Sequence, residues 1–96
     1  MVIAMADEPL MRRLESEATG AYRWSNGPGD RYATHVHPYE KVLYCVAGSI
    51  TFHLEDEGRD VDLRAGDRML LAAGTRHSAV VGPGGCVCIE GRRGSG

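Results

Sequence analysis

The chain has 96 residues, of which 43% are hydrophobic and 25% are charged. These values are close to the averages for globular domains and exclude a wholly disordered chain, a collagen-like repeat and a coiled coil. One hydrophobic core suffices at this length, so we expect a single domain. The 11 basic and 13 acidic residues give a formal net charge of -2. Because there is no basic excess, we expect no nucleic-acid partner.

The cysteines and the apolar segments indicate the cellular compartment in which the protein is expected. Cys45, Cys86 and Cys88 are an odd number, so they cannot form a closed disulfide framework within one chain. Their number favours a reducing setting. No segment approaches the ~20 apolar residues of a membrane span, and the N-terminal apolar run is too short for a signal sequence and lacks a cationic start. We therefore expect a soluble, cytoplasmic protein with no membrane partner.

A helical pattern is present near the N-terminus, over residues 7–18. Asp7 is a suitable capping residue, and Pro9 then falls in the first turn. Met11, Leu14 and Ala18 would share one face of this helix. We expect an N-terminal segment with one short helix over residues 1–19.

The rest of the chain reads as short strands separated by turn residues. About eight strands, with turn signals every 8–12 residues, are typical of an all-β sandwich or barrel. We expect the barrel over residues 20–91 and a flexible tail over residues 92–96, which has nothing to bury. The predicted strands cover residues 21–24, 32–37, 41–47, 49–55, 60–64, 68–72, 77–81 and 86–90.

Three histidines are placed as metal ligands would be. His35 and His37 are two apart on a predicted strand, so both imidazoles project from the same face. His77 begins another predicted strand and reaches the first two if the sheet closes. Neutral imidazole is a common ligand for Zn, Fe, Cu and Ni. A His-x-His pair alone is more often a surface or core feature, so the residues around it decide the interpretation.

The spacing of these residues resembles the two motifs of the cupin superfamily. The first motif is Gly-x5-His-x-His-x(3,4)-Glu-x6-Gly, and Gly29, His35, His37 and Gly48 fall in register with it. The second is Gly-x5-Pro-x-Gly-x2-His-x3-Asn. Its glycines and histidine are matched by Gly66, Gly74 and His77.

The chain departs from these motifs at three positions. Ala72 stands at the proline position and Val81 at the asparagine position, and neither position belongs to the family's metal ligands. Lys41 stands at the glutamate position, with Glu40 one residue earlier. Because neighbouring strand residues point to opposite faces, Glu40 replaces the missing carboxylate only if the preceding turn shifts the register.

The resemblance implies a cupin-type double-stranded β-helix, or jelly-roll barrel, that forms a homodimer and takes a small-molecule ligand. It also implies a divalent metal ion (Zn, Fe, Mn or Ni) with His35, His37, His77 and Glu40 as candidate ligands. Two outcomes follow from Lys41: either the three histidines hold the metal alone, or the site has lost its metal and kept its pocket.

Two functions therefore stay open. The first is a metal-dependent enzyme, an oxygenase or isomerase acting on a small molecule, in which Lys41 and Tyr39 are candidate acid–base groups. The alternative is a non-catalytic binding or sensing cupin that has lost the metal-ligand glutamate. Whether the chain is an enzyme is undecided at this level.

Other polar residues carry smaller predictions. Lys41 pairs with an acidic substrate or with a neighbouring carboxylate inside the barrel, or else its ammonium reaches the solvated mouth of the pocket while its stem packs. Cys45 shares strand parity with Lys41, but a buried free cysteine is usually a small core residue. Tyr39 and Tyr44 suit a pocket wall or a dimer face. His53 alternates out of phase with its apolar neighbours, which indicates an exposed side chain with no role.

Overall fold

The computed structural model describes the backbone of residues 2–94 and the side chains of residues 8–94. Within this range the chain forms one helix and six strands, all paired antiparallel. The elements are α1 (Val2–Glu17), β1 (Thr19–Asn26), β2 (Arg31–His35), β3 (Glu40–Leu54), β4 (Arg59–Arg64), β5 (Arg68–Leu71) and β6 (His77–Arg93).

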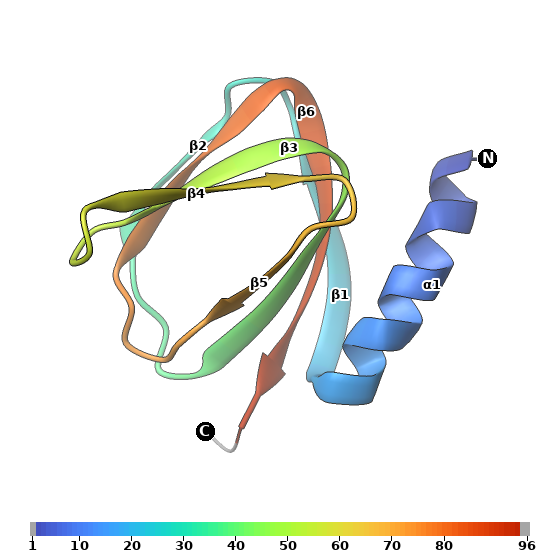
Figure 1. Ribbon diagram of the computed structural model, residues 1–96, viewed down its shortest axis with the longest axis horizontal. Coiled ribbons are helices and arrows are strands. Elements are labelled where there is room, and N and C mark those ends of the chain that lie inside the picture. Colours follow the sequence, from blue (N-terminus) through green and yellow to red (C-terminus); the bar gives the residue numbers. More distant parts are fainter. Residues whose placement is uncertain (1, 95–96) are drawn as a thin grey trace.

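The two long strands, β3 and β6, pair with each other and bend together, so each takes part in both layers of the barrel. The first half of β3 and the second half of β6 form one layer with β5 and β1. Their other halves form the second layer with β4 and β2. Figure 1 shows the strands curled around a common interior, with α1 outside the barrel beside β1. The predicted all-β jelly-roll architecture is confirmed.

Glycines bend these long strands instead of ending them, which is why about eight predicted strands became six. The predicted strands 41–47 and 49–55 run through Gly48 as β3, and 77–81 and 86–90 run on as β6. Gly48 has φ of 72°, and a Cβ atom there would lie 2.0 Å from the carbonyl oxygen of Gly85. Only glycine allows the two bent strands to approach this closely.

The helix begins earlier than predicted. It starts at Val2 instead of Asp7, so Pro9 lies inside the helix and not in its first turn. The predicted capping by Asp7 concerns a side chain outside the described ones. The predicted apolar face is confirmed, because Leu14 is fully buried and Met11 and Ala18 pack with it on the outer surface of the sheet.

The interior between the two layers forms a second, larger apolar cluster. It includes Phe52 and Leu63, and the three free cysteines, Cys45, Cys86 and Cys88, are all buried in it. Cys45 is therefore a core residue. This cluster fills one part of the barrel, and the remaining interior is open to ligands.

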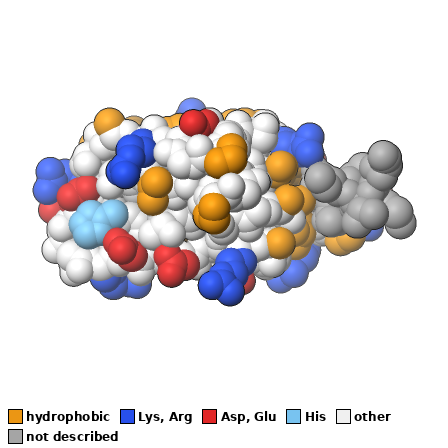
Figure 2. All heavy atoms as spheres, turned by 90° about the horizontal axis from the view of Figure 1, so that it is seen from above, with side chains coloured by type: hydrophobic (Ala, Val, Ile, Leu, Met, Phe, Trp, Pro, Cys, Tyr) orange, Lys and Arg blue, Asp and Glu red, His pale blue; other side chains and the backbone are white. Residues whose placement is uncertain are grey.

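The surface mixes charges of both signs. In the face shown in Figure 2, acidic and basic side chains are interspersed with scattered hydrophobic ones. Among residues 2–94, no helix has the length and apolar content that a bilayer crossing requires.

Candidate metal centre

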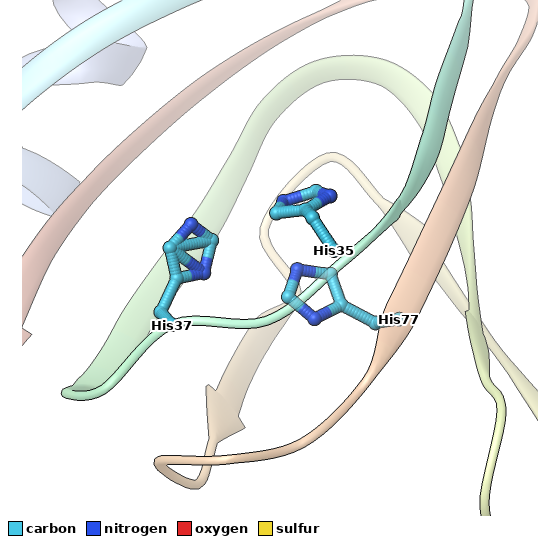
Figure 3. Close-up of side chains that lie close together, drawn as sticks. All are labelled: His35, His37 and His77. Carbon is cyan, nitrogen blue, oxygen red and sulfur yellow. The ribbon is translucent and has the colours of Figure 1, made fainter.

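Two strand ends and one loop bring three histidines together. His35 is the last residue of β2 and His77 is the first residue of β6, and the two face each other directly in the antiparallel register. The predicted strand 32–37 ends at His35, so His37 lies in the loop that follows. Figure 3 shows the three rings gathered at this end of the barrel, with His37 and His35 on one chain segment and His77 on the neighbouring strand.

The distances allow one ion to contact all three rings. Ring centroids are 4.8 Å apart for His35 and His37, 4.3 Å for His35 and His77, and 5.3 Å for His37 and His77. One nitrogen from each residue lies within 4.8 Å of the other two. Two nitrogens that bind one ion at about 2.1 Å are at most about 4.2 Å apart. Small rotations of the rings therefore bring all three nitrogens to ligating distance.

Backbone carbonyls set the protonation pattern of two of the rings. His35 Nδ1 lies 2.8 Å from the carbonyl oxygen of Ala33, and His77 Nδ1 lies 2.9 Å from that of Thr75. A carbonyl only accepts, so each Nδ1 carries the proton and each Nε2 keeps its lone pair. A backbone carbonyl that fixes the tautomer in this way is a common outer partner of metal-binding histidines.

Two ring nitrogens in the group are buried without a partner. Among the described side chains, His37 Nδ1 and His77 Nε2 are the buried polar atoms that have no hydrogen-bond partner. A buried polar atom left unpaired costs about 1–3 kcal/mol, so an unpaired pair of nitrogens in one cluster needs an explanation. A cation bound between the rings supplies one. The donor set therefore fits a divalent metal ion.

Burial also keeps these rings in the form that ligates. Burial lowers the pKa of both His37 and His77 below the ordinary value of 6.5, and the Lys41 ammonium lowers both further. At neutral pH both rings are therefore uncharged, which is the form in which imidazole binds metals.

The histidines lie in a cavity of about 300 Å³. Its volume is at the lower end of the range for small-molecule sites. Most of its other walls are aromatic, and Trp24 packs edge-on against Tyr32 at a centroid distance of 5.8 Å. The full lining consists of Tyr22, Trp24, Tyr32, His35, His37, Tyr39, Lys41, Phe52, His77 and Glu90.

A buried ion pair forms the polar side of this cavity. Lys41 Nζ lies 3.5 Å from Glu90 Oε2, and the two side chains are only 9% and 8% exposed. Glu90 also accepts hydrogen bonds from the Tyr22 hydroxyl and from Trp24 Nε1, each at 2.8 Å. Burial and the hydrogen bond to Glu90 raise the pKa of Tyr22, so this hydroxyl remains a donor. The interpretation of Lys41 as pairing with a carboxylate inside the barrel is confirmed.

Glu90, Tyr22 and Trp24 were missed from the sequence. One signal was available for Glu90, since it shares strand parity with the inward-facing Cys86 and Cys88 and so points into the barrel. A charged residue at an inward position requires a buried partner. No local pattern identifies Tyr22 and Trp24 as its donors.

The structure does not bring Glu40 to the three imidazoles. Its carboxylate accepts a hydrogen bond from Arg93 Nε at 3.0 Å, on the opposite face of β3 from Lys41. The register runs without a shift through this part of β3, with Glu40 opposite Arg93 and Lys41 opposite Arg92. The alternation of a regular strand therefore separates Glu40 from the pocket.

The other polar candidates divide between the pocket and the surface. Tyr39 lines the cavity, and the Arg92 guanidinium lies 4.2 Å above its ring. Tyr44 lies on the helix side of the sheet, where its hydroxyl donates to Glu17. His53 is 43% exposed outside the pocket and pairs with Asp60, which raises its pKa.

Comparison with known proteins adds a family match. A family model described as "Cupin domain" matches residues 22–90. The chain is 36% identical over 74 residues to a 3-hydroxyanthranilate 3,4-dioxygenase of Burkholderia lata, which covers 73% of this chain and 42% of that protein. The chain thus spans about two fifths of the length of this curated relative.

Solved structures share the fold. The DMSP lyase DddQ from Ruegeria pomeroyi superposes with a TM-score of 0.70 at 25% identity, over 78% of this chain and 38% of that one. A Klebsiella pneumoniae protein described as having a double-stranded β-helix domain gives a TM-score of 0.66 at 27% identity, over 76% and 64% of the two chains. The predicted double-stranded β-helix is confirmed.

Proposed function

Because this chain belongs to the cupin family, we propose that it binds one divalent metal ion through His35, His37 and His77 and acts as a metal-dependent oxygenase on a small molecule. The observation that carries the proposal is the set of three clustered imidazoles, two of which present buried nitrogens without a partner. The cavity of about 300 Å³ beside them offers room for a small ligand.

The ligand set bears on the metal and on its chemistry. Three imidazoles suit zinc, iron or nickel better than manganese, which prefers oxygen ligands. When bound, such an ion supplies a Lewis acid with open positions for a substrate or for dioxygen. The candidate ligand set contains no carboxylate, so the ligands do not offset the charge of the ion, which favours an anionic ligand beside it.

The choice of an oxygenase has a single support. The curated relative at 36% identity is a dioxygenase.

A second candidate function has its own observation. Lys41 stands where the cupin motif has glutamate, and its charge is directed to Glu90 and not to a metal. A binding or sensing cupin with the same pocket and no turnover is consistent with this ion pair. The two candidates differ in oxygen consumption.

A cytoplasmic homodimer is part of the same proposal. Three buried cysteines in the free thiol form are suited to a reducing compartment. A core as small as that of a 96-residue chain also gains stability when a partner covers part of its surface.

Metal content and affinity test the proposal. We expect one ion per chain in protein purified without chelator and without a histidine tag. Replacing one ligand in His35→Ala or His77→Ala should weaken metal binding by more than the roughly 10- to 100-fold that loss of an outer partner costs. His53→Ala is the matched control, because this histidine lies outside the pocket.

The outcomes separate the alternatives. Metal content that is unchanged in His77→Ala contradicts the metal site. If the iron-loaded protein consumes no oxygen with a panel of small acids and phenols, the binding module is favoured over the oxygenase.

A further inference from the structure

The Lys41 ammonium has hydrogen-bond donors that Glu90 does not engage. It is carried by the first half of β3, its side chain is 9% exposed, and it lines the same cavity as the three histidines. An ammonium has three N–H donors in a tetrahedral arrangement. Among the described residues, Lys41 pairs with Glu90, and Lys41 Nζ lies 3.5 Å from Glu90 Oε2. One carboxylate at that distance cannot engage all three donors, and because Lys41 lines the cavity, an acceptor on a bound ligand can supply a second partner.

Glu90, by contrast, is engaged at both of its carboxylate oxygens. Its Oε1 accepts from Trp24 Nε1, and its Oε2 accepts from the Tyr22 hydroxyl and lies next to Lys41. The two donors come from β1 and Lys41 comes from β3, on opposite sides of β6. Glu90 is thus held rigidly from both neighbouring strands, and in turn it holds Lys41 at one place in the cavity wall.

The rest of the cavity agrees with an anionic, flat ligand. Lys41 is the cation among the lining residues, and a second cation, the Arg92 guanidinium, lies over the ring of the lining residue Tyr39. Trp24, Tyr32 and Phe52 present aromatic surfaces to the same space. Aromatic side chains pack well against planar groups. The Glu90 carboxylate is already paired with Lys41.

We propose that Lys41 is the specificity-determining residue of this cavity and that it selects small organic acids by binding their carboxylate. The ligand lies between the aromatic walls, with its carboxylate on Lys41 Nζ and its other end toward the histidines. The role of the ligand as a substrate rests on the proposed function, but recognition of its carboxylate by Lys41 does not require a bound metal.

Benzoate and its uncharged isostere benzamide are suitable probes. Trp24 is the only tryptophan of the chain and lines the cavity, so its fluorescence reports binding there directly. In metal-free protein we expect benzoate to bind at least about tenfold more tightly than benzamide. The reason is that a hydrogen bond from the Lys41 ammonium to a charged carboxylate oxygen is stronger than one to a neutral amide oxygen. Zinc-loaded protein is titrated in parallel.

The decisive variant is the double replacement Lys41→Met/Glu90→Gln. It removes both charges together, so no unpaired charge is left buried and the fold is retained. Selectivity for benzoate should fall to within about twofold. The matched control is Glu17→Gln/Arg68→Met, which removes an ion pair of 2.6 Å outside the cavity and should keep the full preference.

Several results overturn the inference. They are equal affinity of the wild type for the two probes, no binding of benzoate, and a preference that survives in Lys41→Met/Glu90→Gln. The metal site is judged separately: selectivity without metal binding contradicts only the proposed function, whereas metal binding without selectivity contradicts only the role of Lys41.

Discussion

The buried ion pair of Lys41 and Glu90 leads to a prediction about the free energy of unfolding. Lys41→Met leaves the Glu90 carboxylate in the barrel without its counter-charge, although Tyr22 and Trp24 still donate to it. Glu90→Gln leaves the Lys41 ammonium unpaired in the same way. The double variant removes both charges at once and keeps an amide that can pair with the two aromatic donors. The three variants and the wild type form a double-mutant cycle.

The magnitude follows from the burial of the pair. Breaking a buried ion pair from one side costs about 3–5 kcal/mol. Both side chains are less than a tenth exposed, but they border a cavity that admits water, so we take the lower end, about 3 kcal/mol for each single variant. The double variant should lose about 2 kcal/mol or less, because neither charge is left alone. The resulting coupling energy is about 4 kcal/mol or more.

Urea unfolding measured by tryptophan fluorescence tests this cycle. With an m-value of about 1.5 kcal/mol/M, each single variant should unfold at a urea concentration about 2 M lower than the wild type. The double variant should unfold at a higher concentration than either single variant. If the losses of the two single variants simply add in the double variant, the charges do not interact, and the structural account of Lys41 is wrong.

Two further predictions concern the helix contact and the strand bend. A hydrogen bond from Arg68 lowers the pKa of Glu17 from 4.5 to about 2, so this carboxylate stabilises the fold above about pH 4.5 and loses that effect as the pH falls toward 2. Glu17→Gln should therefore lower the free energy of unfolding by about 1 kcal/mol at pH 6, since the pair lies near the surface, and by much less at pH 2, where half of the Glu17 carboxyls in the folded protein are protonated. Urea titrations at both pH values measure this difference between Glu17→Gln and the wild type. If the loss of unfolding free energy is the same at pH 6 and pH 2, the Glu17 carboxylate does not stabilise the fold in this way. Gly48→Ala should lower the free energy of unfolding by more than about 2 kcal/mol, because φ of residue 48 is 72° and the new Cβ atom would clash with the backbone of Gly85. Gly58→Ala, with positive φ but open space, should cost about half as much in the same assay; equal losses would show that the close approach at Gly48 is unimportant.

Much of the fold and of the metal centre was predictable because it depends on local order in the chain. Alternation of apolar residues indicates strands, since successive side chains of a strand point to opposite faces. The His-x-His pair alone did not predict a site, but the resemblance of its surroundings to the two cupin motifs predicted three clustered imidazoles, as the structure has them. The same alternation predicted that Glu40 and Lys41 point to opposite faces of a regular strand, and the structure confirms this.

Local sequence patterns did not predict the features that depend on contacts between residues far apart in the sequence. The glycines of β3 and β6 read as strand ends, and only the pairing of the two strands turns them into shared bends. In the same way, Glu90 meets Trp24 and Tyr22 across 66 and 68 residues of chain.

Sequence alone therefore determined the class of fold and the three histidines that cluster, because strand periodicity and motif spacings are set by the order of residues along the chain. Tertiary structure decided what surrounds these histidines: a lysine held by a buried carboxylate, with aromatic walls facing it. The reason is physical. A charge can stay inside a barrel only where other strands supply its partner, and which strands lie next to each other is a property of the folded chain.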